Sequence, residues 1–201
     1  NHYFLKNQKM GKFHNVEQNS EEWFELRLGK ATSSNFNKIM VWHDKGKWGV
    51  WAITYAKKVA LERITGKRDE TKSFTSADME RGHTYEPVAI ILYEKEKFTE
   101  VKEGGFYSMG KAGDSPDGLV WERGCVEVKT RIPNTFWDRI EKGGVDSSYS
   151  WQVQGHLLIG DKDWCDFIDF CPEFPEEKQL LVYRINRDEE IISKLEKRLT
   201  E

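Results

Sequence analysis

The chain has 201 residues, of which 38% are hydrophobic and 32% charged, and its 8 Trp and 11 Phe exclude a disordered chain of low hydrophobicity. No apolar run approaches the roughly 20 residues that a membrane span requires, so no membrane partner is expected. The formal net charge of −3 argues against a simple basic nucleic-acid binder, although 31 Lys and Arg residues can still form a local positive surface. Three widely spaced cysteines form neither a disulfide framework nor a zinc pattern, which favours the cytoplasm.

The first half of the chain is predicted to be helical. Asn19 or Ser20 can cap a short helix that carries two glutamates in its first turn and ends at Gly29. Serines and a threonine at 32–34 are cap candidates for a second helix that reaches Met40.

A third and a fourth helix follow in the pattern. Gly66 stops the third, predicted over about 50–64 with one apolar stripe. The stripe consists of Ala52, Ala56, Val59, Ala60 and Ile64. The fourth, over about 76–97, contains Pro87, so Glu86 should lie at a kink or at a junction of two helices. Between the second and third helices, the basic and aromatic stretch 42–48 fits either a DNA-contacting loop or an ordinary surface loop.

The middle of the chain changes to the period of strands. Short strands are predicted at 104–107, 118–121 and 125–130, with a hairpin turn at 122–124 between the last two. A helix at about 149–159, strands at 164–170 and 180–185, and a closing helix from Arg187 complete the chain. This order predicts an α/β or α+β fold with a sheet flanked by helices.

The hairpin gathers charged side chains. Residues two apart on a strand share a face, so Glu127 and Lys129 point one way while Val126 and Val128 point into the core. A turn centred near residue 123 places Asp117 beside Glu127 on the neighbouring strand.

Two carboxylates and the carbonyl of Val128 are oxygen ligands of the kind that Mg²⁺ prefers. A bound ion can polarise a phosphoryl oxygen and acidify a bound water, while Lys129 orients that water and offsets transition-state charge. Asp117, Glu127 and Lys129 are therefore the candidate catalytic residues. On the pattern alone, a solvated salt-bridged strand face is the more ordinary interpretation.

Several blocks of sequence together resemble one family. Ser115-Pro116-Asp117-Gly118-Leu119 followed by Glu127-Val128-Lys129 resembles the core of the PD-(D/E)XK nuclease superfamily, and more specifically the phage lambda exonuclease and YqaJ-type viral recombinase family. Further blocks follow in the order of that family over about 16–190. They are Val16-Glu17-Gln18, Trp23, Leu26-Arg27-Leu28-Gly29, Thr32, Ser34, Gly82, Tyr85, Glu86, Gln152-Val153-Gln154 and Arg187-Asp188-Glu189.

The resemblance implies a fold and a set of roles. It implies one nuclease domain over 1–201, with a helical part at about 16–97 and a restriction-endonuclease-like mixed sheet core at about 101–186. Asp117, Glu127 and the Val128 carbonyl would hold Mg²⁺, with Mn²⁺ as a substitute, and Glu86 would serve a second ion. Lys129 matches the catalytic lysine and Gln154 an active-site glutamine. Residues that match a 5′-phosphate pocket are Arg27, Ser34 and Ser115.

The resemblance also implies an activity, a 5′→3′ exonuclease that digests linear double-stranded DNA to mononucleotides. Its products would be 3′ overhangs for phage-type recombination with a single-strand annealing protein, in a host cytoplasm if the chain is phage-encoded. A homotrimeric ring is the expected assembly, although the chain ends soon after its last helix begins. Two alternatives remain, an endonuclease or junction nuclease with the same core, and a DNA-binding or assembly domain without catalysis.

Overall fold

The computed structural model describes residues 11–40, 48–68 and 77–201, and these residues form two β-sheets. The central sheet has the strand order β3-β6-β7-β8-β9, in which β7 and β8 are parallel and the other neighbours antiparallel. Its strands are β3 (Val101–Glu103), β6 (Gly118–Val120), β7 (Gly124–Thr130), β8 (Trp164–Phe170) and β9 (Leu180–Asn186). The second sheet, in the order β1-β4-β5-β2, has β1 (Lys12–His14), β4 (Phe106–Met109), β5 (Ala112–Asp114) and β2 (Ala31–Thr32).

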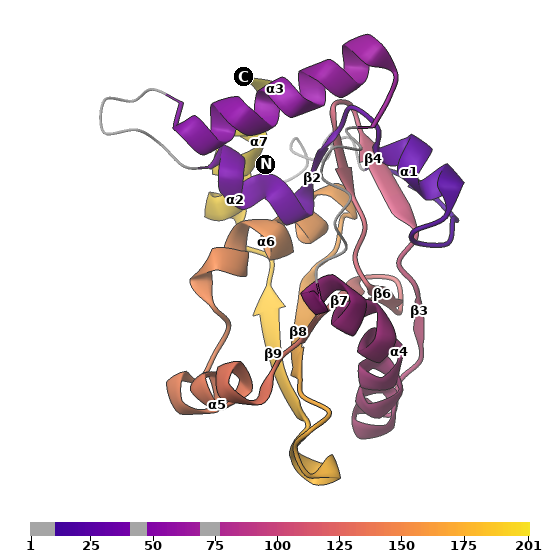
Figure 1. Cartoon of the computed structure of the whole chain (residues 1–201), viewed down its shortest axis with the longest axis vertical. Helices are drawn as coiled ribbons and strands as arrows, with labels where there is room; N and C mark the ends of the chain where they lie inside the picture. Colours follow the sequence, from indigo (N-terminus) through magenta and orange to yellow (C-terminus); the bar gives the residue numbers. More distant parts are fainter. Residues whose placement is uncertain (1–10, 41–47, 69–76) are drawn as a thin grey trace, which may run out of the picture.

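Helices flank both sheets (Figure 1). They are α1 (Glu21–Arg27), α2 (Phe36–Ile39), α3 (Val50–Thr65), α4 (Ala77–Lys97), α5 (Pro133–Lys142), α6 (Ser150–Ile159) and α7 (Glu189–Thr200), with short 3₁₀ turns that include η1 (Ser33–Asn35) and η3 (Ser147–Tyr149). No described helix is both long and apolar enough to cross a membrane. The predicted mixed α/β fold is confirmed.

Strand β7 is buried on both faces. Val126 and Val128 pack with Ala89 and Tyr93 of α4 in one apolar cluster. Cys125, on the opposite face of the strand, belongs to a second cluster, which contains residues of α6 and α7. The predicted alternation along this strand is confirmed, and it places the sheet between α4 on one side and α6 on the other.

Two helices differ from the prediction. Helix α4 runs unbroken through Pro87, so the alternative of two helices meeting there is wrong. Proline inside a helix costs about 3 kcal/mol, and burial of Ala89 and Tyr93 after it offsets that cost. In α3 the apolar stripe is misplaced, because Tyr55 and Glu62 lie on the buried face with Ala52 while Ile64 is 80% exposed.

One helix was not predicted, and one predicted loop cannot be compared with the structure. Helix α5, which begins with Pro133 at its first turn, was not predicted at all. The sequence signal for the start of this helix is Pro133, because the N–H groups of the first helical turn have no partner within the helix and proline lacks this group. Of the stretch 42–48, residues 42–47 lie outside the described residues.

Two helical glycines offer a matched test of packing. A Cβ on Gly155 of α6 would lie 2.7 Å from the Phe36 ring and 3.0 Å from Ser33 Cβ, whereas a Cβ on Gly82 of α4 would meet nothing within 4 Å. Helix propensity alone favours alanine over glycine by about 1 kcal/mol at either site. Overpacking costs about 1–3 kcal/mol, so Gly155→Ala should lower the free energy of unfolding in urea while Gly82→Ala raises it. Stabilisation by both substitutions would contradict this packing.

Candidate active site

The β6–β7 hairpin brings the two predicted carboxylates together. Gly118 pairs with Val126 across the hairpin, which sets Asp117 opposite Glu127. Asp117 Oδ2 accepts a hydrogen bond of 2.6 Å from the main-chain N–H of Val128. The register expected from the turn is therefore the register observed, and Asp117 is fixed against the strand that carries Glu127 and Lys129.

Glu127 has charged or polar partners on both oxygens. Its Oε1 accepts from Lys129 Nζ and from Gln152 Nε2, each at 2.6 Å. Its Oε2 lies 3.0 Å from His156 Nε2, at an angle that falls short of a good hydrogen bond. The carboxylate is buried, so this set of partners is what makes a charged group tolerable inside the protein.

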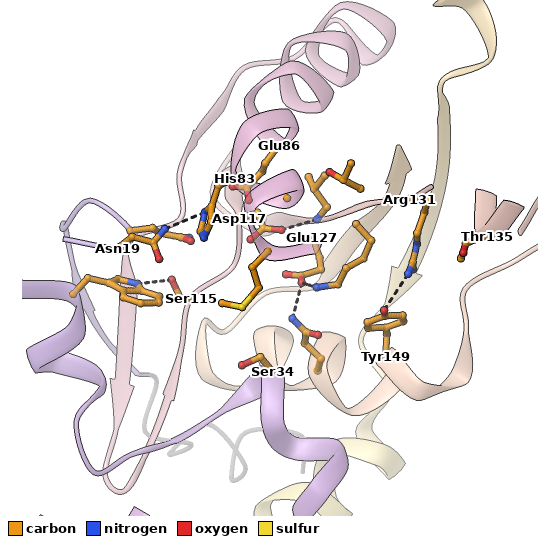
Figure 2. Close-up of a pocket in the computed structure, with 18 of the residues that line it drawn as sticks. Asn19, Ser34, His83, Glu86, Ser115, Asp117, Glu127, Arg131, Thr135 and Tyr149 are labelled. Carbon is orange, nitrogen blue, oxygen red and sulfur yellow. Dashed lines mark hydrogen bonds and ion pairs between the residues drawn. The ribbon is translucent and has the colours of Figure 1, made fainter. Parts of the chain in front are cut away.

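These groups face a cavity of about 660 Å³ between α1, α4, β7 and the start of α5 and α6. Figure 2 shows Asn19, His83 and Ser115 on one side of the carboxylates and Arg131, Thr135 and Tyr149 on the other. The further lining residues include Gln18, Trp23, Arg27, Ser34, Met79, Gly82, Glu86, Lys129 and Gln152. A volume of this size falls in the range of small-ligand sites.

Three carboxylates share this cavity with one ammonium. Burial first, and then the charge of Glu127, raise the pKa of Glu86 to about 7. Burial and the charges of Glu127 and Glu86 also raise the pKa of Asp117 well above its usual value. Burial opposes ionisation of Glu127, but the Lys129 charge and the His156 contact lower its pKa. The carboxylates therefore repel one another, and a cation would relieve that repulsion.

The donor set fits a hard divalent cation. Asp117 and Glu127 supply carboxylate oxygens, Val128 adds a carbonyl, and Glu86 lies on α4 across the cavity. In the part of the chain that the structure describes, no three His, Cys, Asp or Glu side chains form a ready-made metal cluster. Mg²⁺ usually keeps several waters and needs only one or two protein carboxylates, so two carboxylates and a carbonyl suffice.

The three residues predicted for a phosphate pocket all line the same cavity. The Arg27 guanidinium lies over the Trp23 ring at 4.0 Å and makes no ion pair with a described residue. Burial lowers the pKa of Arg27. Ser34 lies in η1 and contacts Thr32 Oγ1 at 3.4 Å. A half-buried arginine that forms no ion pair with a described residue is suited to an anionic ligand.

The Ser115 hydroxyl is already engaged within the protein. It donates to Gly105 O at 2.7 Å and accepts from Trp23 Nε1 at 2.9 Å. Ser115 thus orients the indole on which the Arg27 guanidinium stacks. Trp23 is buried and also forms part of the cavity wall.

Gln154 is not in the cavity. Its side chain donates to Asn186 O at 2.9 Å and accepts from Asp188 N at 3.0 Å, so it joins α6 to the segment before α7. Its neighbour Gln152 faces the cavity and contacts Glu127 instead. The structure therefore does not bring Gln154 to the other predicted residues, and the glutamine at the site is Gln152.

Sequence patterns also missed two pairs of charged or titratable side chains near the carboxylates. His156 and Asp114 are buried in contact with each other, and the five scattered histidines gave no signal for such a pair. At the other end, Arg131 pairs with Asp169 at 2.5 Å and donates to Tyr149 Oη at 3.2 Å. Its position two residues after Lys129, directly beyond the end of β7, was the available signal.

Comparisons with known proteins identify the family of the chain and structures with a similar fold. A family model described as the YqaJ-like viral recombinase domain matches residues 22–163. An alkaline exonuclease from Laribacter hongkongensis is similar in structure, with a TM-score of 0.81 and 30% identity over 90% of this chain and 89% of that one. The same exonuclease in complex with dAMP matches with a TM-score of 0.80, 30% identity and the same coverage.

A phage related exonuclease from Haemophilus somnus 129PT shares the fold, with a TM-score of 0.67 and 16% identity over 85% of this chain and 90% of that one. A search of curated proteins found no significant match. The family match spans well over half of the 201 residues and includes the whole β6–β7 hairpin. The predicted family is therefore confirmed, and the chain belongs to the YqaJ-like viral recombinase domain family.

Proposed function

We propose that this protein is a Mg²⁺-dependent 5′→3′ exonuclease that digests linear double-stranded DNA to mononucleotides. The observation that carries the proposal is the cavity itself, in which Asp117, Glu127 and Lys129 lie together and Arg27 lines the same space. The similarity to the Laribacter alkaline exonuclease supports a nuclease activity. Its complex with dAMP supports DNA as the substrate class.

In this proposal the carboxylates bind metal ions and Lys129 acts on the water and the phosphate. Asp117, Glu127 and the Val128 carbonyl would hold one Mg²⁺ ion, with Mn²⁺ as a substitute, and Glu86 would serve a second. Ions bound there would supply Lewis acidity toward the phosphate and lower the pKa of a bound water. Lys129, 2.6 Å from Glu127 Oε1, positions the attacking water and offsets the charge that develops on the phosphoryl oxygens. Gln152 takes the place at the site that sequence assigned to Gln154.

The other end of the cavity recognises the strand end. Arg27 offers a planar fork of donors to a 5′-phosphate, Ser34 adds a hydroxyl, and Ser115 holds Trp23 in place beneath Arg27. Binding the terminal phosphate here sets the first phosphodiester over the carboxylates, which gives the 5′→3′ direction. The 3′ overhang that remains is the substrate of a single-strand annealing protein in phage-type recombination.

Assembly into a homotrimeric ring is part of the proposal. Helix α3 leaves large apolar side chains exposed, namely Val50, Trp51, Leu61 and Ile64. An apolar helix face of this kind is typical of an interface between copies of a chain. Light scattering on the purified protein tests this directly, because a trimer has three times the mass of one chain and a monomer would exclude the ring.

A substrate comparison tests the activity. The protein is incubated with Mg²⁺ and linear duplex DNA carrying either a 5′-phosphate or a 5′-hydroxyl, with closed circular DNA alongside, and mononucleotide release is followed. We expect fast release from the phosphorylated duplex, slow release from the hydroxyl form and an intact circle. A nicked circle with no end preference would instead indicate an endonuclease. Absence of cleavage with either Mg²⁺ or Mn²⁺ would leave a DNA-binding domain without catalysis.

A further inference from the structure

A buried histidine joins the Glu127 carboxylate to a second acid. His156 on α6 is 1% exposed, and its Nδ1 lies 2.7 Å from Asp114 Oδ1 while its Nε2 lies 3.0 Å from Glu127 Oε2. The Asp114 side chain is fully buried and also accepts from the Ser33 hydroxyl. A single chain of polar contacts thus runs from Ser33 through Asp114 and His156 to Glu127.

This chain of contacts crosses the layers of the fold. Ser33 lies in η1 and Asp114 ends β5 of the second sheet, whereas Glu127 lies on β7 of the central sheet. Ser33 and Asp114 each directly precede a proposed phosphate-pocket residue, Ser34 and Ser115 respectively. The contacts of His156 therefore connect the strand that carries Glu127 with the segments that precede Ser34 and Ser115.

The two oxygens of Glu127 are used differently. Oε1 accepts from Lys129 and Gln152, and both of these residues line the cavity. Oε2 faces His156, which is not among the residues that line the cavity. We propose that His156 is a positioning residue that holds Glu127 by Oε2 and so presents Oε1 to a divalent cation. The proposal rests on the metal-dependent function above and adds which oxygen serves the ion and which residue fixes it.

The size of the effect follows from the surroundings of Glu127. A buried carboxylate that loses a charged partner either moves or remains poorly compensated. Partners that orient metal ligands typically change metal affinity by about 10–100-fold when they are removed. His156 is well suited to this task because Asp114 holds the opposite side of the imidazole ring, which restricts its rotation.

Two substitutions of similar size separate the two contacts of the ring. The amide nitrogen of glutamine lies about as far along the side chain as Nε2, so His156→Gln keeps a donor for Glu127. Asparagine reaches only as far as Nδ1, so His156→Asn keeps the Asp114 contact and loses the Glu127 contact. Binding of Mn²⁺ alone to DNA-free protein, followed by electron paramagnetic resonance, is the readout, with thermal unfolding measured alongside.

We expect His156→Asn to weaken Mn²⁺ binding by about 10–100-fold and His156→Gln to stay within about threefold of the wild type. Equal affinity in His156→Asn and the wild type would overturn the inference, as would equal losses in both variants. If the histidine variants do not fold, Asp114→Asn replaces them, because it keeps the imidazole and removes only the charge that holds it. A loss of about tenfold, the lower end of the range for such partners, is then expected because the imidazole remains, and wild-type affinity would overturn the inference.

Failure of the proposed function would give a different result. The wild-type protein would then show no Mn²⁺ binding that is lost in Asp117→Ala. Failure of the inference alone leaves such a site intact in the wild type and unchanged in His156→Asn.

Discussion

Lys129→Ala is expected to lower the rate of DNA cleavage by about 10²–10⁴-fold, the range for loss of a group that transfers a proton or stabilises developing charge. The ammonium lies 2.6 Å from Glu127 Oε1 in the cavity, 5.3 Å from the centre of the Tyr149 ring. Burial would lower the pKa of Lys129, but the charges of Glu127 and Asp117 raise it. The side chain is therefore a fixed positive charge beside the carboxylates, and alanine leaves nothing in its place.

DNA binding should survive this substitution. Arg27, Arg131 and the pocket at the strand end remain, and affinity for DNA comes mainly from contacts with many phosphates. The measurements are single-turnover cleavage with Mg²⁺ and fluorescence anisotropy of a phosphorylated duplex with Ca²⁺. Lys111→Ala, in the exposed turn between β4 and β5, is the matched control for loss of one positive charge. Cleavage by Lys129→Ala at a rate near that of the wild type would remove the hairpin from consideration as the active site.

The hairpin was predictable because its information is local. A turn of known length fixes the register of two strands, and alternation along 125–130 then decides which side chains face the core. Asp117, Glu127 and Lys129 thus follow from about fifteen consecutive residues and need no knowledge of the remaining fold. The pairing of Gly118 with Val126 is the observation that bears this out.

The remainder of the site depends on contacts between distant segments. Gln152 and Gln154 lie on nearly opposite faces of α6, and only the packing of that helix against β7 decides which of them meets Glu127. The contact between His156 and Asp114 joins residues 42 positions apart. Helix α3 carries apolar residues all round, so its buried face could be chosen only from its neighbours. Pattern and spacing contain none of this information.

Arg27→Ala is expected to remove the preference for a 5′-phosphorylated end. The guanidinium stacks on Trp23, lines the cavity and makes no ion pair with a described residue. A hydrogen bond to a charged group contributes about 1.5–3 kcal/mol, and each 1.4 kcal/mol is a factor of about ten. The kcat/KM on phosphorylated duplex should therefore fall by about 10–150-fold, while the value on the 5′-hydroxyl duplex changes little.

Substrate and variant together form a thermodynamic cycle. If Arg27 contacts the terminal phosphate, removal of either partner has the same effect, and removal of both costs little more than removal of one. Arg68→Ala is the matched control. The Arg68 guanidinium lies 3.9 Å from the ring centre of Phe24, which is on α1 beside Trp23, but Arg68 does not line the cavity. It should preserve the phosphate preference. An equal fall of Arg27→Ala on both substrates would mean that the arginine binds the DNA backbone in general. The direction of digestion would then need another structural cause, since the terminal phosphate would have no dedicated cation in the cavity.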